Sequence, residues 1–238
     1  MKAQSLDLSE AIPFKNSLND QERDTLSNIG FTHRYYDINS VVKAEPGDVF
    51  VLIHSGWGCL YSSIPEGERQ ILDFPLRGDL FLLSHSDNRL GETLICLTEL
   101  AVSQAPASGV IAAAGNSPGL MSLLVSASIR HRTILVQHLN SVGRRKALAR
   151  VAHLLLELGC RLEIAGAASK DGFRCPLTQY DIADALGLTA IHVNRMLRDL
   201  RERGFIEFRQ KTIRFLDKPG LTRLAGFDPG YLEINRSK

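Results

Sequence analysis

The sequence predicts an α+β protein with three parts: a β-rich N-terminal part, a long helix, and a C-terminal part of helices followed by a hairpin. Between residues 31 and 113, short apolar runs alternate with turn residues. Residues 120–158 contain no proline and one glycine, Gly143, and their apolar residues recur at helical spacing. The third observation is charge, because the chain is acidic before residue 144 and basic after it.

Composition argues against membrane and secreted proteins. The chain has 238 residues, of which 44% are hydrophobic and 23% charged, a balance typical of soluble globular proteins. No run approaches the roughly 18 apolar residues of a membrane span, and the N-terminus lacks the pattern of a secretion signal. The four cysteines are scattered, which fits a reducing compartment: Cys59, Cys96, Cys160 and Cys175. We therefore expect a cytoplasmic protein without a membrane partner.

The charge asymmetry indicates a basic module that contacts a polyanion. Residues 144–238 hold 18 Lys and Arg against 11 Asp and Glu, whereas residues 1–143 hold 10 against 15. Nucleic acid is the commonest polyanion in a cytoplasm. Ordinary scatter of surface charge is the alternative interpretation.

The N-terminal part is predicted to be an antiparallel sandwich or roll. Its apolar runs are rich in Val, Ile, Phe and Tyr, which favour strands; they cover residues 49–64, 69–76, 79–84 and 93–105. A helix is predicted before them over Asp20–Ile29, capped by Asn19 or Asp20 and ended by Gly30. The segment from His54 to Gly58 is predicted to be a β hairpin.

The long helix is predicted over Leu120–Gly143, with Ser117 as its cap and Pro118 in the first turn. At 1.5 Å per residue it would be about 36 Å long, which is too long for one small domain to cover. One face is therefore expected to pack on the roll and another on a partner helix. A heptad seam can be drawn that favours a parallel homodimer: Met121, Leu124, Ser128, His131, Leu135, His138 and Val142.

The C-terminal part contains two short helices joined by a tight turn. It is preceded by a helix predicted over Arg145–Leu158, closed by Gly159, and by a loop over Ile164–Gly172. Thr178 is expected to cap the first short helix together with Asp181. Gly187 permits the left-handed turn, and Thr189 caps the second helix. Gly204 ends that helix, and a hairpin follows over Phe205–Phe208 and Thr212–Leu216. Helix, turn, helix and basic hairpin together form a winged helix-turn-helix.

The second of these helices has a polar face that suits the major groove of double-stranded DNA. Arg195 is the best candidate for a bidentate contact to guanine, and Lys211 for a phosphate contact from the wing. The candidate DNA-contacting residues are Thr178, Thr189, Ala190, Ile191, His192, Asn194, Arg195, Arg198 and Lys211. The alternative is that they are the solvated charges of an ordinary helical hairpin.

The sequence resembles the Crp/Fnr superfamily of bacterial transcription regulators. The resemblance is carried by LTQYDIADALGLTAIHVNRMLRDLRERGFI and VGRRKALARVAHLLLELG, and more loosely by GDVFVLIHSGWGCLY and GERQILDFPLRGDL. It implies a cyclic-nucleotide-binding-like β-roll as the sensor domain (1–116), a dimerisation helix (117–143) and a winged helix-turn-helix domain (144–238). It also implies a homodimer on a near-palindromic operator, with RNA polymerase as a further partner.

Carried over to this sequence, the family's base-contacting positions fall on Ala190, Ile191 and Arg195, and its phosphate-contacting positions on Thr189 and His192. Two of the base-contacting positions are apolar here. Specificity is therefore expected to depend on Arg195 and on contacts to thymine methyl groups.

The sequence departs from the family's cyclic-nucleotide cassette. After Gly78-Asp79 come four apolar residues where a glutamate is expected, and Gly91-Glu92-Thr93 stands where the family has Arg-Ser. Glu92 would repel a phosphate, and Arg89 is the one substitute cation. We therefore expect no cyclic AMP.

No other cofactor is expected. Residues 1–58 lack the cysteines of an iron–sulfur cluster. Three histidines could ligate haem but fit structural roles better: His33, His54 and His85. Two others, His131 and His138, would make the seam pH-sensitive if they lay in it. The motifs of hydrolases, P-loops and zinc proteases are also missing, so the protein is not expected to be an enzyme.

Two alternatives to a plain regulator stay open. One is a regulator gated by an unknown small molecule in the roll or by a thiol redox signal, for which Cys160 and Cys175 are the better placed cysteines. The other is a protein-interaction module that keeps the fold without recognising an operator.

Overall fold

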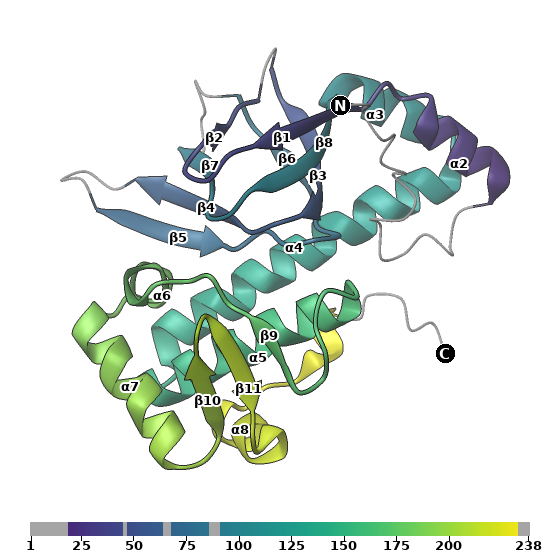
Figure 1. Ribbon diagram of the computed structural model, residues 1–238. Helices are drawn as coiled ribbons and strands as arrows, with labels where there is room; N and C mark the ends of the chain where they lie inside the picture. The colour runs from purple at the N-terminus through teal and green to yellow at the C-terminus, as the bar shows by residue number, and fades with distance from the viewer. Residues whose placement is uncertain (1–18, 45–46, 64–67, 86–90, 233–238) are drawn as a thin grey trace. The chain divides into compact units, whose positions relative to one another are not determined.

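The computed structural model describes residues 19–44, 47–63, 68–85 and 91–232 (Figure 1). Two compact units emerge: the described parts of Met1–Gly58 and Pro75–His131 form one, and those of Cys59–Phe74 and Arg132–Lys238 form the other. Arg89 of the predicted cassette lies outside the described residues. Among the helices that the structure describes, none is long and apolar enough to cross a membrane.

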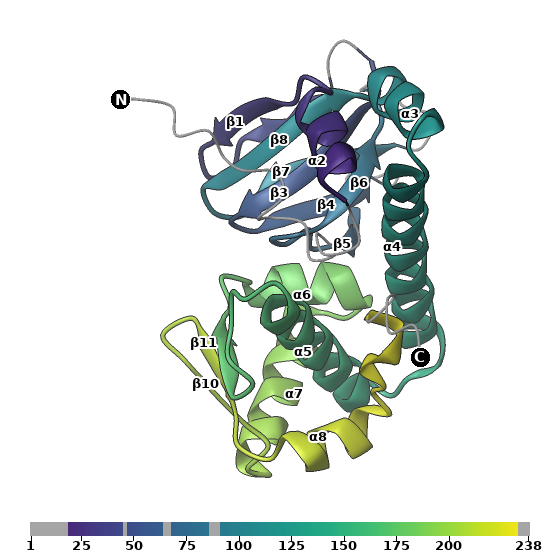
Figure 2. The ribbon, with the colours of Figure 1, turned by 90° about the vertical axis from the view of Figure 1, so that its right-hand side faces the viewer.

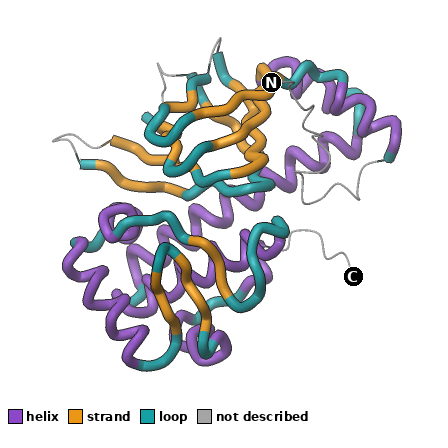
Figure 3. Tube along the Cα trace, viewed as in Figure 1, coloured by secondary structure: helices purple, strands orange, loops and turns teal. Residues whose placement is uncertain are grey.

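The strands of the N-terminal part form the predicted β-roll (Figure 3). One antiparallel sheet has the order β1-β8-β3-β6, with bounds Thr32–Tyr36, Leu100–Pro106, Val49–Ser55 and Leu80–Leu83. In the second sheet, β2 (Val41–Val42) pairs with β7 (Glu92–Cys96), and β4 (Gly58–Ser63) pairs with β5 (Arg69–Asp73). Most residues of β3 and β8 are buried, because these strands form the centre of the first sheet.

The predicted hairpin from His54 to Gly58 is wrong. The partners of β3 are β6 and β8, while β4 pairs with β5, so this segment is a corner where the chain leaves one sheet for the other. The Thr98 hydroxyl accepts the Trp57 N–H at 2.9 Å in this corner. The apolar run over residues 49–64 predicts strands, but the run alone does not determine which strands pair with each other.

Helix α2 (Asp20–Ser27) begins with the predicted cap and covers the first sheet (Figure 2). The Asn19 side chain accepts the Glu22 N–H at 2.9 Å, and the Glu22 carboxylate accepts the Asn19 N–H at 2.9 Å. The helix ends at Ser27, earlier than the predicted Ile29. Its Leu26 belongs to a core cluster with residues of β3, β8 and the following helices.

Residues 107–113 were predicted to belong to the β-rich part but form most of α3 (Ala107–Gly115). Val110 and Ala114, four residues apart, are its buried residues. Three consecutive alanines favour a helix here, and burial of one face stabilises it.

The long helix α4 (Pro118–Arg144) confirms the prediction and extends it at both ends. The Ser117 hydroxyl accepts the Leu120 N–H at 3.4 Å, as expected of a cap. Leu120, Leu123 and Leu124 are buried in the core cluster with Leu26.

The C-terminal part contains the predicted winged helix-turn-helix. Its elements in order are α5 (Ala147–Ile164), β9 (Gly172–Arg174), α6 (Gln179–Leu186), α7 (Ala190–Glu202), β10 (Ile206–Arg209), β11 (Thr212–Phe215), α8 (Lys218–Ala225) and the 3-10 helix η2 (Pro229–Leu232). The three strands form an antiparallel sheet in the order β10-β11-β9. The third strand, β9, begins at the end of the predicted loop over Ile164–Gly172, and Ile164 itself belongs to α5.

Gly159 does not end a helix, as the sequence predicted, but lies inside α5. A Cβ added there would come within 2.9 Å of the Phe215 ring and 3.2 Å of the Phe173 ring. Glycine is required because the sheet β10-β11-β9 packs Phe215 and Phe173 directly on the backbone of α5 at this point.

We expect Gly159→Ala to lower the free energy of unfolding by about 1–3 kcal/mol, because the added methyl overpacks the core. Gly109→Ala in α3 is the matched control, since its Cβ would meet nothing within 4 Å. That variant should gain up to about 1 kcal/mol from better helix propensity. Urea unfolding of both variants measures the two effects, and equal changes would contradict the packing argument.

Candidate nucleic-acid interface

Helix α6 begins at the predicted capping box. The Thr178 hydroxyl accepts the Asp181 N–H at 3.2 Å and donates to the Asp181 carboxylate at 2.7 Å. That carboxylate also accepts the Thr178 N–H at 2.8 Å. The Thr178 hydroxyl is thus committed to the cap, although Thr178 was also predicted to contact DNA.

The turn between α6 and α7 follows the sequence prediction. Gly187 adopts φ 60° and ψ 45°, the left-handed conformation that glycine adopts without strain. Thr189 caps α7, with its hydroxyl accepting the His192 N–H at 3.2 Å. The predicted inner face of α7 is confirmed, because Val193, Met196, Leu197 and Leu200 are buried.

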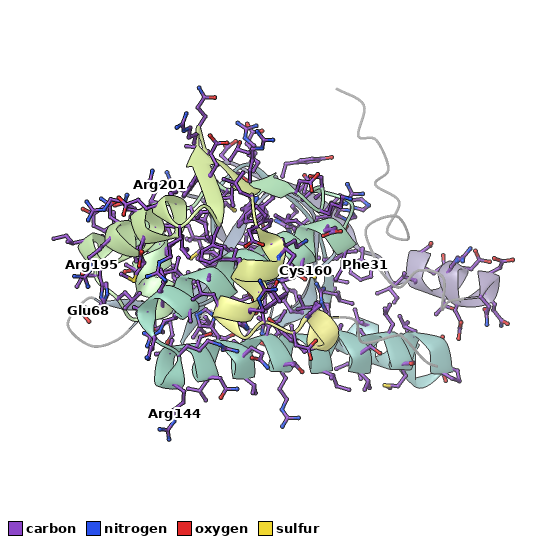
Figure 4. The ribbon with its side chains drawn as sticks, turned by 90° about the horizontal axis from the view of Figure 1, so that it is seen from below. Phe31, Glu68, Arg144, Cys160, Arg195 and Arg201 are labelled. Atoms are coloured by element: carbon purple, nitrogen blue, oxygen red, sulfur yellow. The ribbon has the colours of Figure 1, made fainter. Side chains whose placement is uncertain are left out.

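The outer face of α7 presents most of the candidate DNA-contacting residues. Ile191, Arg195 and Arg198 are exposed and follow one another at i, i+4 and i+7, so they lie on one line along the helix. Asn194 is exposed beside that line, whereas Ala190 and His192 are half-buried. In Figure 4, Arg195 and Arg201 extend outward from α7.

The wing places further cations beside α7. Gln210 and Lys211 have φ 49° and 56°, so β10 and β11 are joined by a two-residue turn with both residues left-handed. A groove of about 230 Å³ lies between α7 and the wing. Its lining is Gln179, Asn194, Leu197, Arg201, Phe208, Arg209, Gln210 and Lys211. The three cations and three side-chain amides of this lining suit the anionic backbone of a nucleic acid.

Two residues of β5, which sequence reasoning missed, form hydrogen bonds with α6. The Arg69 guanidinium donates to Asp184 at 2.7 Å and to Asp181 at 3.0 Å. The Gln70 amide donates to the main-chain carbonyls of Asp184 and Ala185 at 2.9 and 3.1 Å. The partners lie more than 100 positions apart in the chain, and no local pattern links them.

These contacts border a second groove, of about 700 Å³, at the start of α7. Its lining is Glu68, Arg69, Gln70, Ala183, Asp184, Gly187, Leu188, Thr189 and His192. Thr189 and His192, two of the predicted phosphate contacts, both line it.

The C-terminal carbonyls of α6 receive further side chains from α4 and α5. His138 lies 2.6 Å from the Ala185 carbonyl through its Nε2. Arg150 donates to the Leu186 carbonyl at 2.6 Å and to the Val142 carbonyl at 2.9 Å. The helix-turn-helix is therefore fixed at the end of its first helix by three separate elements.

A buried charge network lies behind the helix-turn-helix. The Arg161 guanidinium donates to Asp73 at 2.7 and 3.2 Å and to the Phe74 carbonyl at 3.1 Å. Glu157, 3.6 Å from Arg161, accepts the Tyr231 hydroxyl, and burial raises its pKa. Arg161 and its partners are almost inaccessible to water, so removing one of them would leave an uncompensated buried charge.

The predicted seam residues of α4 have contacts inside the chain. Leu124 is buried in the core cluster, the His131 ring stacks on Phe81, and His138 contacts Ala185. Leu135 and Val142 are half-buried, while Met121 and Ser128 are exposed. The other large apolar residues that α4 exposes lie on a neighbouring line: Val125, Ile129, Val136 and Leu139.

In the described part of the cassette region, Asp79 has partners within the chain. Asp79 accepts the Arg130 guanidinium at 2.8 Å and the Leu76 N–H at 2.7 Å. Glu92, where the family has a cation, is half-buried, and this burial raises its pKa.

The histidines considered as haem ligands also have protein partners. Ser103 contacts both His54 and His33, and His85 lies 2.6 Å from the Ala44 carbonyl. Within the described ranges, no group of three or more His, Cys, Asp or Glu is arranged to hold a metal.

We expect Thr178→Ala to lower the free energy of unfolding by about 1 kcal/mol, because the α6 cap is lost. Thr178→Ser keeps the hydroxyl and should unfold like the unmodified chain. Urea unfolding measures the cap, and DNA affinity of the folded variants separately measures the predicted DNA contact. If the alanine and serine variants were equally stable, the capping role would be refuted.

Comparison with known proteins agrees with this geometry. Residues 149–224 match the Crp-like helix-turn-helix domain. The nitrogen fixation regulation protein FixK of Bradyrhizobium diazoefficiens is 33% identical over 169 residues, which cover 70% of this chain and 69% of that protein. The transcriptional activator protein FnrA of Stutzerimonas stutzeri is 28% identical over 214 residues, covering 88% and 87%.

A solved structure supports the same assignment. FixK2 from Bradyrhizobium japonicum superposes with a TM-score of 0.71 at 25% identity, covering 83% of this chain and 98% of that one. These relatives are regulators of transcription and not enzymes, as the sequence predicted. The chain belongs to the Crp/Fnr family of DNA-binding transcription regulators.

Proposed function

We propose that the protein binds a near-palindromic operator as a homodimer in the cytoplasm, without cyclic AMP, and regulates transcription by contacting or blocking RNA polymerase. The proposal divides the chain into a sensor roll (1–116), a dimerisation helix (117–143) and a DNA-binding domain (144–238). The observation that carries it is the outer face of α7, where Ile191, Arg195 and Arg198 are exposed in one line beside a cationic wing.

A helix of this kind fits the major groove of double-stranded DNA. Its N-terminal residues would reach base edges, and Arg195 can donate two hydrogen bonds to guanine. Lys211 on the wing and Thr189 at the α7 cap would contact phosphates and set the register. A dimer would place two such helices about one turn of DNA apart, which explains the near-palindrome.

The homodimer is supported by the exposed face of α4. Val125, Ile129, Val136 and Leu139 are all exposed, and Leu139 most of all, at 71%. With Arg132 between them, they follow the alternating spacing of four and three residues that is typical of a coiled-coil seam. We therefore assign the seam to this line, which the sequence pattern had placed one residue earlier, through Leu124 and His131.

The absence of cyclic AMP is supported by the chemistry of the roll. A cyclic phosphate needs a cation, yet Arg130 is engaged by Asp79, and the half-buried Glu92 supplies no positive charge. A thiol signal has little support from Cys59, Cys96 and Cys175, because burial raises their pKa values to about 12, 11 and 12. Thiols of such high pKa hold too little thiolate to react quickly.

We expect Arg195→Ala to cost about 1–3 kcal/mol of binding at one operator position and to relax the preference for guanine there. The measurement is in vitro selection of DNA sites by the purified protein, with no ligand added and at stated salt, followed by affinities for the selected site. Arg223→Ala, an exposed arginine on α8, is the matched control.

The two results of the selection separate the alternatives. Recovery of a near-palindrome that depends on Arg195 supports the proposal and shows that no dissociable signal is required. Recovery of non-specific DNA, with sites that emerge after a small molecule or reductant is added, favours a gated regulator. An operator preference unchanged in Arg195→Ala would refute the role of that residue.

We expect Leu139→Glu to shift the protein from dimer to monomer, because a charge would be buried in the proposed seam. Leu216→Glu, an exposed leucine beyond β11, is the matched control and should leave the dimer intact. Sedimentation equilibrium across protein concentrations measures the change. A dimer that tolerates Leu139→Glu but dissociates in Ser128→Glu would place the seam on the line that the sequence first indicated.

A further inference from the structure

Strand β5 forms hydrogen bonds with helices of the C-terminal part at both of its ends. At its start, Arg69 and Gln70 contact α6. At its end, the Asp73 carboxylate accepts two hydrogen bonds from Arg161 of α5, and the adjacent Phe74 carbonyl accepts a third. Gln70 and Asp73 are only about 10 Å apart in an extended strand, so a shift at one end of β5 also moves the other.

The pairing of β5 with β4 explains how both ends reach helices. Asp73 pairs with Leu60. Ile71, two positions earlier, pairs with Tyr61, the very next residue of β4, so β5 has one extra residue and contains a bulge. Residues three positions apart point to opposite faces of a regular strand. The bulge re-aims the side chains beyond it, and Gln70 and Asp73 both contact helices.

The buried pair of Arg161 and Asp73 contributes geometry more than stability. Arg161 is 1% exposed and Asp73 is 4% exposed. The attraction within such a pair is largely offset by the loss of hydration, and apolar residues of similar volume are often as stabilising. A planar guanidinium that donates to both oxygens of a carboxylate does fix the direction of its partner. The pair therefore determines where β5 ends relative to α5.

We propose that Arg161 is a positioning residue for operator binding, because it fixes the end of β5 and thereby the α6 end of the helix-turn-helix. The inference rests on the proposed function, since the effect is measured at the operator. A guanidinium so deeply buried cannot contact DNA itself. Its influence reaches α7 through β5, the Gln70 amide and the carbonyls of Asp184 and Ala185.

The first test uses Asp73→Asn in the full chain, which keeps the shape of the side chain and removes its charge. It should weaken binding to the selected operator by about threefold to tenfold at constant salt, as expected for a residue that acts through a packed network. Asp79→Asn is the matched control, because Asp79 pairs with the buried Arg130 in the other unit. It should also lower the free energy of unfolding, but leave operator affinity unchanged.

A double-mutant cycle tests whether the effect passes through β5. Gln70→Ala removes the amide that contacts the α6 carbonyls, and it should weaken operator binding by itself. The double variant Gln70→Ala/Asp73→Asn should lose less affinity than the product of the two single losses, because both changes interrupt one route. Arg161→Lys is a second variant should Asp73→Asn not fold. It keeps the buried charge but cannot donate to both carboxylate oxygens, and it should show the same loss.

The outcomes distinguish this inference from the function on which it rests. Failure to select any operator would refute operator recognition itself. A folded Asp73→Asn or Arg161→Lys variant with unchanged affinity would overturn the role of Arg161 and leave the regulator intact. Losses that multiply in the double variant, or an equal loss in Asp79→Asn, would also overturn it. Should neither variant fold, Gln70→Ala decides, since unchanged affinity there would show that β5 does not position α7.

Discussion

The helix-turn-helix depends on satisfying the carbonyl groups at the end of a helix that is too short to be stable alone. Helix α6 has eight residues, well below the length at which an isolated helix persists in water. Its last carbonyls have no partners within the helix. Gln70 from β5, His138 from α4 and Arg150 from α5 contact these carbonyls. Since α7 follows after a three-residue turn, these contacts set the direction of α7.

A further contact from β5, that of Arg69, lowers the negative charge beside the candidate interface. Asp181 is needed to cap α6, and Asp184 lines the groove that Thr189 and His192 share. Two uncompensated carboxylates there would repel the phosphate backbone. Arg69 contacts both at hydrogen-bonding distance, and its single positive charge offsets one of the two negative charges. Because Arg69 is one-third exposed, the pairs contribute more to the local potential than to folding stability.

Sequence reasoning succeeded where a local signal decides the structure. The caps at Asn19, Thr178 and Thr189 and the left-handed turn at Gly187 each follow from a few neighbouring residues. It failed where a partner distant in the chain decides, as at Gly159. A glycine is typical of a helix end, but this one lies within α5. Two aromatic rings pack against it there and leave no room for a side chain. The contacts of Arg69 and Gln70 were out of reach for the same reason.

The long helix shows why periodicity alone could not identify an exposed face. Helix α4 carries apolar residues on two adjacent lines, and a heptad can be drawn through either of them. Burial separates the lines, because Leu124 belongs to a core that includes α2 and α3, while Leu139 is exposed. A helix with apolar residues on two sides must bury one within its own chain, and the side left in water is the one available to a second copy.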